Sequence, residues 1–157
     1  MQEFLGVDTS NYTTSLALSR DGEIVKNLKK LLDVKEGQRG LRQSDAVFAH
    51  TVNLPHLFDE MGRISPAAVG VSVSPRDAEG SYMPCFLAGI SCAAAVASTF
   101  GVPLYRFSHQ AGHIAAALYS CGAEPLIHGR FLAFHVSGGT TELLLSDNMN
   151  ILSLIHI

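Results

Sequence analysis

The sequence predicts an α/β protein with a mixed sheet, in which three strands come first and strand–helix pairs follow. Three observations predict this class: β-rich segments around a hairpin turn near the N-terminus, continuous apolar runs further on, and apolar helical segments between those runs. The composition agrees, because 47% hydrophobic and 16% charged residues are typical of a globular chain. A length of 157 residues is enough for one domain with a substantial core.

The N-terminal part contains three predicted strands. Residues 4–8 (Phe-Leu-Gly-Val-Asp) are a short apolar run, which predicts a buried strand. Residues 13–18 are rich in β-formers, and the Asp-Gly pair at 21–22 predicts a hairpin turn that leads into a returning strand over 23–32. A polar loop that contains glycines is expected over residues 35–44.

Helices are predicted between the later strands. The first begins at Ser44 or Asp45, either of which can cap it, and runs towards Met61. Pro55 lies inside this pattern and is expected to kink or split the helix. The remaining predicted elements are, in chain order, strand 67–73, helix 84–100, strand 102–106, helix 109–119, and strands 131–136 and 142–145.

The predicted order is therefore β-β-β-α-β-α-β-α, followed by a second hairpin. Antiparallel strands that lead into βαβα units predict a ribonuclease-H-like domain, and two such domains with a nucleotide between them define the actin-like ATPase fold. The sequence predicts domain I over residues 1–125 and the start of a truncated domain II over 126–151, so that only the N-terminal half of the fold is present. Such a fragment is expected to be inactive and to expose apolar surface on its hairpin at 131–145.

The last six residues, 152–157, are treated separately. Their sequence, Leu-Ser-Leu-Ile-His-Ile, is what a common transposon sequencing adaptor spells when translated. We therefore interpret them as a sequencing-adaptor artefact and leave them out of the fold prediction. A genuine short strand is the alternative.

Charge, hydropathy and cysteine content restrict the class of protein. A net charge of −3 gives no basic footprint over the whole chain, so contact with a nucleic acid requires a local patch, a partner or a missing segment. No apolar run reaches the roughly 18 residues of a membrane span, and the acidic N-terminus is no signal peptide. The three cysteines lack the spacing of metal ligands, which predicts buried thiols in a cytoplasmic protein.

Two predicted hairpins carry residues suited to a phosphate-containing ligand. Asp8, Thr9 and Ser10 follow the first strand as catalytic candidates, because an acid and neighbouring hydroxyl groups suit phosphates and their metal. The second turn, Ser137-Gly138-Gly139, lets a ligand pass close to the backbone. Either turn alone is compatible with an ordinary hairpin, but together they predict a nucleotide cleft.

His109 and His113 form the third candidate site. Their i, i+4 spacing puts both imidazoles on one helix face, where they can hold one metal ion. Zinc-protease helices have the same spacing but need Glu after the first His, whereas this chain has Gln110, which argues against a metallopeptidase. Surface or capping residues are the alternative for this pair, since Ser108 can cap the same helix.

Taken in this order, the three segments resemble the TsaD/Gcp family of tRNA threonylcarbamoyladenosine transferases, once called O-sialoglycoprotein endopeptidases. The matching segments are 6–10, 103–113 and 131–140, and weaker matches occur at 40–50 with Pro55 and at 74–75. The resemblance covers nearly the whole chain up to Leu145.

The resemblance implies a reaction and a site. It implies that threonylcarbamoyl moves from threonylcarbamoyl-AMP to N6 of the adenosine beside the tRNA anticodon. His109 and His113 would hold one divalent metal ion, iron or zinc, together with an Asp from the missing C-terminal half. The residues implied to bind the adenylate are His135, Val136, Ser137, Gly138 and Gly139. The implied partners are tRNA and accessory proteins like TsaB and TsaE.

The chain also departs from the family pattern. Asn11-Tyr12-Thr13 replaces the usual Cys-Asp-Glu, residues 74–82 replace a Gly-Pro-Gly-Leu loop, and Thr140 replaces a His. These departures indicate a divergent branch, in which Asp77 and Glu79 either supply replacement acids or belong to a solvated loop. Two other functions stay open: a non-catalytic paralogue that dimerises with an active subunit, and a small-molecule kinase or ATPase of the same superfamily.

Overall fold

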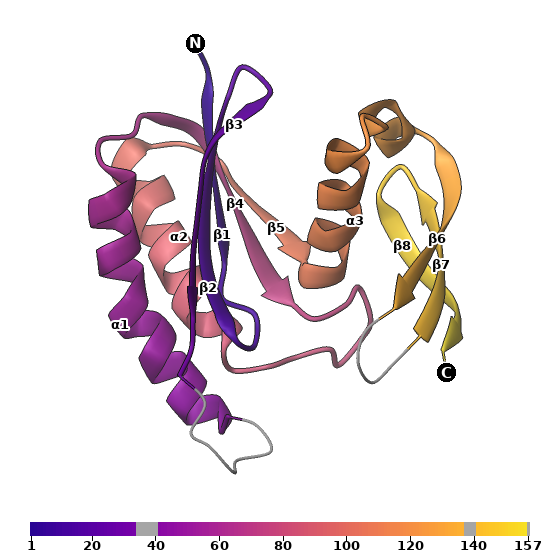
Figure 1. The fold of residues 1–157 in the computed structure, drawn as a ribbon, viewed down its shortest axis with the longest axis horizontal. Helices are drawn as coiled ribbons and strands as arrows, with labels where there is room; N and C mark the ends of the chain where they lie inside the picture. The colour runs from indigo at the N-terminus through magenta and orange to yellow at the C-terminus, as the bar shows by residue number, and fades with distance from the viewer. Residues whose placement is uncertain (34–40, 137–140, 157) are drawn as a thin grey trace. The chain divides into compact units, whose positions relative to one another are not determined.

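The computed structural model of this chain describes residues 1–33, 41–136 and 141–156; most of the predicted loop at 35–44 lies outside them. The described residues form two compact units (Figure 1). Unit 1 contains residues 1–75 and 82–107, and unit 2 contains 76–81 and the described part of 108–157. Each unit has its own sheet and its own apolar core.

Unit 1 is built on a five-stranded sheet with the strand order β3-β2-β1-β4-β5. The first three strands pair antiparallel, whereas β1 and β4 pair parallel, so the sheet is mixed as predicted. The hairpin between β2 and β3 turns at Asp21 and Gly22, whose φ angles of 50° and 92° are those of the predicted tight turn. The strands are β1 (Glu3–Asp8), β2 (Thr13–Arg20), β3 (Glu23–Leu31), β4 (Pro66–Ser74) and β5 (Leu104–Ser108).

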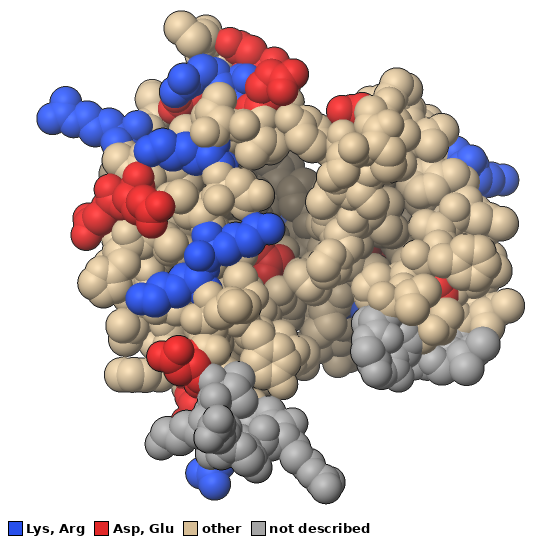
Figure 2. All heavy atoms as spheres, viewed as in Figure 1, with Lys and Arg blue, Asp and Glu red and all other residues tan. Residues whose placement is uncertain are grey.

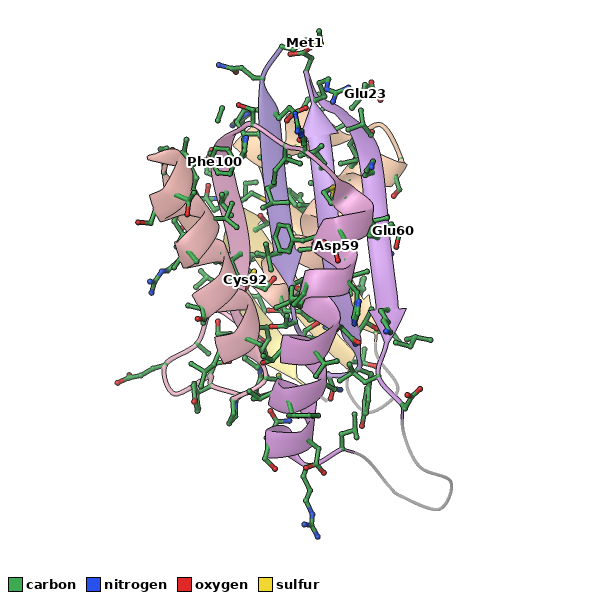
Figure 3. All side chains as sticks on the ribbon, turned by 90° about the vertical axis from the view of Figure 1, so that its left-hand side faces the viewer. Met1, Glu23, Asp59, Glu60, Cys92 and Phe100 are labelled. Carbon is green, nitrogen blue, oxygen red and sulfur yellow. The ribbon has the colours of Figure 1, made fainter. Side chains whose placement is uncertain are left out.

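Two helices, α1 (Gln43–Met61) and α2 (Phe86–Phe100), cover one face of this sheet and lie side by side there (Figure 3). The small residues of α2 let it lie close to the strands. The core between helices and sheet consists of apolar side chains from β1, β2, β4 and both helices: Leu5, Val7, Leu16, Leu18, Leu54, Leu57, Met61, Val69, Val71, Ala88, Ala93 and Ala97.

The predicted cap of α1 is wrong, and of the two effects expected from Pro55 the split does not occur. The helix begins at Gln43, and its N-cap is Arg42 without a side-chain hydrogen bond, so Ser44 and Asp45 lie in the first turn and do not cap it. The helix also continues through Pro55 as one element of 19 residues rather than splitting. Pro55 is exposed, so water can solvate the carbonyl that lacks its helical donor.

Strand β5 begins two residues later than predicted because the preceding residues complete the end of α2. Gly101 adopts a left-handed conformation with φ 65°, and the N–H of Val102 donates to the Ala97 carbonyl, 3.0 Å away. Val102 is therefore part of the helix cap. Pro103, which has no N–H, separates that cap from the strand.

Unit 2 combines a three-stranded antiparallel sheet with one long helix. The helix α3 (His109–Ser120) begins at Ser108, whose hydroxyl accepts a hydrogen bond from the Ala111 N–H at 3.1 Å, so the predicted cap is confirmed. A short 3-10 helix η1 (Glu124–His128) leads to β6 (Arg130–Val136), β7 (Thr141–Asp147) and β8 (Asn150–His156), in that order across the sheet. The core of unit 2 is formed by Ala111, Ile114, Leu118, Leu144 and Ile151.

Strand β8 agrees with the alternative of a genuine short strand, although residues 152–157 were left out of the fold prediction itself. It pairs antiparallel with β7 through a turn at Asn148 and Met149. Their φ angles of 51° and 62° are those of a two-residue hairpin turn without glycine. The adaptor interpretation and the domain boundary after residue 125 stay predictions.

One face of the unit 2 sheet is apolar and exposed. On β6, Leu132, Phe134 and Val136 alternate with residues that face α3, and Phe134 is 76% exposed. The strand register places Leu145 and Leu143 of β7 opposite the first two of these side chains. The expectation that the hairpin at 131–145 exposes apolar surface is confirmed.

On the face shown in Figure 2, most Lys and Arg side chains lie over unit 1, with acidic side chains beside them, whereas unit 2 shows few charged groups. This agrees with the net charge of −3. Within the part of the chain that the structure describes, no helix is long and apolar enough to cross a membrane.

The three cysteines are free, and two of them are shielded. Cys85 is buried, and Cys92 lies in the groove between α1 and α2 beside Leu54 and Phe58. Burial raises the pKa of both thiols, which makes them poor nucleophiles. Cys121 is exposed just after α3, so the prediction of buried thiols is wrong for this residue.

Candidate functional site

Asp8 lies at the carboxyl end of β1, in unit 1, and both of its oxygens accept hydrogen bonds. One oxygen accepts from the backbone N–H of Ser10 at 2.7 Å, and the other accepts from the hydroxyl of Ser72 on the parallel strand β4. The carboxyl ends of adjacent parallel strands are where open α/β sheets bind ligands. The position of Asp8 therefore suits a ligand site, and its catalytic role stays a prediction.

Thr9 is fully buried and is tied to the first turn of α2. Its hydroxyl donates to the Cys85 carbonyl at 2.9 Å and accepts from the Gly89 N–H at 3.1 Å. These two backbone groups are an i, i+4 pair of the helix, so the Thr9 hydroxyl bridges them. This geometry gives Thr9 a structural task that the sequence analysis did not anticipate.

A buried chain of polar side chains lies beside the Asp8 turn. The Asn53 amide donates to the Thr14 hydroxyl at 3.2 Å, and that hydroxyl lies 2.9 Å from Nδ1 of His50. Because the Thr14 oxygen accepts from Asn53, the Thr14 hydroxyl donates its proton to Nδ1 of His50. In the neutral ring the proton is then on Nε2. Sequence analysis included His50 only in a weak resemblance, because nothing local to α1 shows that a histidine is buried there.

Burial lowers the pKa of His50, although the Asn11 backbone and the Asp8 carboxylate oppose this shift. The unfolded chain, where the ordinary pKa is 6.5, therefore binds more protons than the folded protein at mildly acidic pH. We expect the free energy of unfolding to fall as pH drops below about 6.5, because the unfolded chain then takes up a proton that the folded protein binds less readily.

Urea unfolding of the wild-type chain at pH 7.5 and pH 5.0 measures this dependence, and His50→Gln is the variant to compare. The variant is expected to lose less stability between the two pH values than the wild type. An equal loss in both proteins would contradict the assignment to His50. His56, an exposed histidine of the same helix, provides the control substitution His56→Gln.

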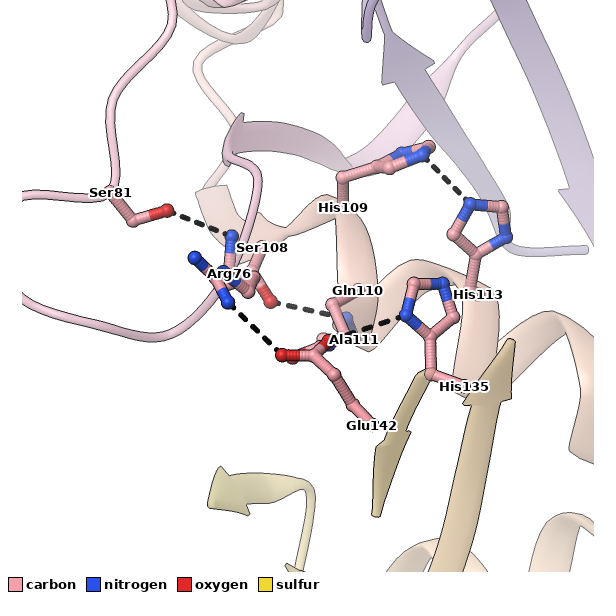
Figure 4. Close-up of polar contacts among 9 residues, drawn as sticks. All are labelled: Arg76, Ser81, Ser108, His109, Gln110, Ala111, His113, His135 and Glu142. Carbon is pink, nitrogen blue, oxygen red and sulfur yellow. Dashed lines mark hydrogen bonds and ion pairs between the residues drawn. The ribbon is translucent and has the colours of Figure 1, made fainter. Parts of the chain in front are cut away.

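In unit 2, His109 and His113 face each other from the first turns of α3. Their Nε2 atoms are 2.8 Å apart, and the ring centroids are 4.2 Å apart (Figure 4). The prediction that both imidazoles share one helix face is confirmed. Their predicted role as metal ligands also requires that the distance between the two nitrogens suits a single ion.

The pair has nearly the geometry of two ligands on one ion. Two nitrogens at about 2.05 Å from a tetrahedral zinc ion are about 3.3 Å apart, so the two rings would need to separate by only about 0.5 Å. Imidazole nitrogen is also a donor that suits zinc and iron. Among residues 1–33, 41–136 and 141–156, however, no three His, Cys, Asp or Glu side chains are placed to hold a metal ion.

A buried carboxylate, Glu142 on β7, lies at the centre of the polar contacts around this pair (Figure 4). It contacts Arg76, Gln110 and His135, which come from a loop, from α3 and from β6. The His135 ring centroid lies 5.7 Å from that of His113. His135 is thus close to the histidine pair, although the sequence analysis placed it only with the adenylate contacts.

The other predicted adenylate contacts are Val136 and the three residues that follow it. Val136 ends β6 and is 71% exposed on the apolar face, on the opposite side of the strand from His135. Ser137, Gly138 and Gly139 lie outside the described residues. Their role in ligand binding stays a prediction.

Solved structures with the same arrangement of elements identify the class of fold. YeaZ from Pseudomonas aeruginosa aligns with a TM-score of 0.58 at 15% identity, covering 100% of this chain and 67% of its own. A ROK family protein from Streptococcus pneumoniae aligns with a TM-score of 0.52 at 12% identity, covering 96% of this chain and 48% of its own. The chain therefore has an actin-like α/β fold, as predicted.

Sequence relatives extend this comparison. The tRNA N6-adenosine threonylcarbamoyltransferase of Thermosipho africanus is 31% identical over 145 residues, which are 90% of this chain and 42% of the relative. The enzyme of the same name from Corynebacterium aurimucosum is 38% identical over 100 residues, 61% of this chain and 26% of the relative. Over most of its length the chain is therefore similar to tRNA N6-adenosine threonylcarbamoyltransferases.

The chain spans less than half the length of these curated relatives. No protein-family model matches it.

Proposed function

We propose that this protein belongs to the catalytic members of the tRNA N6-adenosine threonylcarbamoyltransferase family and transfers threonylcarbamoyl from threonylcarbamoyl-AMP to N6 of the adenosine beside the tRNA anticodon. The observation that carries this proposal is the facing pair of His109 and His113, whose Nε2 atoms are 2.8 Å apart. A chain without catalytic function has no need of two imidazoles in this geometry. The names of the sequence relatives support the same reaction.

In this proposal, His109 and His113 hold one divalent ion, zinc or iron, with a further ligand from outside the described residues. When bound, the ion polarises the carbonyl of the acyl donor. The N6 amine forms a bond to the carbonyl carbon, the bond from that carbon to the phosphate oxygen breaks, AMP leaves, and the amine proton passes to solvent. Residues 135–139 bind the adenylate.

Gln110 has a different task from the general base of a metallopeptidase. Its amide donates to Glu142 at 2.6 Å and its side chain is 3% exposed, so it neither accepts a proton nor faces a substrate. The peptidase alternative therefore has no support from this residue.

We also propose a cytoplasmic location, with tRNA and TsaB- or TsaE-like proteins as partners, because this reaction takes place on tRNA.

A non-catalytic partner subunit is the second candidate. It is favoured by Asn11-Tyr12-Thr13, which lacks the acids of the family pattern, and Tyr12 is exposed at the turn where they would lie. A small-molecule kinase or ATPase is the third candidate function, and it does not explain the histidine pair. Metal content separates the first two, since a partner subunit is expected to contain no bound metal.

The test is nucleoside analysis of tRNA from cells that depend on the full-length gene. We expect threonylcarbamoyladenosine to be present with the wild-type gene and to be lost with His109→Ala. His128→Ala, an exposed histidine in the same unit, is the control and should leave the modification intact. The proposal is wrong if cells without the gene keep the modification, or if the wild-type gene fails to restore it.

A further inference from the structure

We propose that Glu142 is a positioning residue for the histidine site: its buried carboxylate sets the tautomer of the His135 ring and holds the turn of α3 that carries His109 and His113. The consequence for catalysis depends on the proposed function. The geometric claim concerns only contacts within unit 2.

The first step is the environment of the carboxylate. Glu142 is 2% exposed, and a carboxylate that is removed from water is stable only when hydrogen-bonded and paired with charge. One oxygen lies 3.0 Å from the Arg76 guanidinium, which is itself partly exposed. The other oxygen accepts from the Gln110 amide at 2.6 Å and lies 3.4 Å from Nδ1 of His135. One buried group thus joins three segments that are distant in the sequence.

The second step is the protonation of His135. A carboxylate only accepts hydrogen bonds, so it favours a proton on the nearer ring nitrogen, Nδ1. At 3.4 Å the contact is longer than an ordinary hydrogen bond, and its effect is mainly electrostatic. In the neutral ring, Nε2 is then the acceptor. The same ring lies 5.7 Å, centroid to centroid, from His113 and is inclined to it by 32°.

The third step is the orientation of α3. Gln110 lies between the two histidines in the sequence but is buried on the side of the helix that faces the sheet. Its bond to Glu142 fixes the rotation of the first turn, and the Ser108 cap fixes where that turn begins. His109 and His113 consequently keep a defined direction on the same turn. Removal of a direct hydrogen-bond partner of a ligand typically lowers metal affinity 10–100-fold, and Glu142 acts one residue further away, through Gln110, so that about a 3–10-fold loss is expected.

The first experiment tests the tautomer without any metal. Long-range proton–nitrogen NMR spectra of the histidine-labelled chain at pH 8 distinguish Nδ1–H from Nε2–H rings. We expect His135 in the Nδ1–H form in the wild type and a shift towards Nε2–H in Glu142→Leu, which has no acceptor. Glu142→Gln keeps one acceptor oxygen and should give an intermediate result. An Nε2–H ring in the wild type, or an unchanged ring in the folded Leu variant, would overturn the proposal.

The second experiment measures the Co²⁺ affinity of the full-length protein from the visible absorption of the bound ion. Glu142→Gln is expected to bind Co²⁺ about 3–10-fold more weakly than the wild type, less than for a direct partner of a ligand. The matched control, Glu124→Gln, removes an exposed carboxylate from the same unit and should bind as the wild type does. Equal affinity in Glu142→Gln and the wild type would overturn the positioning role. A wild type that binds no Co²⁺ would contradict the proposed function, and the tautomer experiment alone would then decide about Glu142.

Discussion

Replacing His113 by alanine is expected to lower the affinity of the full-length protein for Co²⁺ or Zn²⁺ by more than about 100-fold, since loss of a hydrogen-bond partner of a ligand already costs 10–100-fold. The reason is geometric: the Nε2 atoms of His109 and His113 are 2.8 Å apart, so a single ion can bind both. Without one ring, no second imidazole on α3 lies at this distance. Titration followed by absorption spectroscopy or calorimetry measures the affinity.

His128→Ala is the control for this experiment. His128 is an exposed residue of η1 in the same unit, and its removal changes the number of histidines without changing the pair. We expect wild-type affinity in this variant. If His113→Ala also bound metal with wild-type affinity, the pair would not be the metal site.

Gly89→Ala is expected to destabilise the protein by about 2–4 kcal/mol, the sum of overpacking and a disturbed buried hydrogen bond. A Cβ at this position would lie 2.7 Å from the Thr9 hydroxyl oxygen and 3.2 Å from the Thr9 methyl carbon. Thr9 cannot move aside easily, because it is fully buried and its hydroxyl bridges Cys85 and Gly89. The free energy of urea unfolding measures the effect.

Two further variants test this explanation. Gly112→Ala adds the same methyl group to an exposed site on α3 with no atom within 4 Å, and it should be neutral or stabilise by up to about 1 kcal/mol. Thr9→Ala combined with Gly89→Ala should be more stable than the two single effects predict, because the clash is gone. A Gly89→Ala protein as stable as the wild type would refute the predicted clash.

The sheet of unit 1 could be predicted because its signals are local. The Asp-Gly pair at 21–22 specifies a tight hairpin, and the alternation of apolar residues on β2 specifies its buried face. The left-out strand β8 shows the opposite case. Its turn at Asn148 and Met149 has no glycine, so the local sequence gives little indication of a hairpin.

The candidate site could be predicted only in part. The spacing of His109 and His113 specifies that they share a helix face, and the structure confirms it. The contacts of Glu142 could not be predicted, because Arg76 and Gln110 reach it from distant parts of the sequence. A carboxylate on a strand is usually solvated, and only tertiary packing shows that this one is buried.

Thr9 illustrates the same limit of local patterns. In sequence, Asp8, Thr9 and Ser10 form one polar group at a strand end. In the structure, Asp8 accepts hydrogen bonds from the turn and from Ser72, whereas Thr9 points into the core beneath α2. Adjacent residues of an extended strand face opposite sides of the sheet. The side chains of Asp8 and Thr9 therefore point in opposite directions, and only that of Thr9 enters the core.

The central place of β1 in its sheet has a consequence for synthesis on the ribosome. β1 is made first, and it can form a meander with β2 and β3 soon after they emerge. Its other edge pairs with β4, where Val7 lies opposite Val71, so this edge stays unpaired until β4 and α1 have been made. The nascent chain therefore carries an open, apolar strand edge until β4 has emerged, which is the kind of surface that chaperones protect.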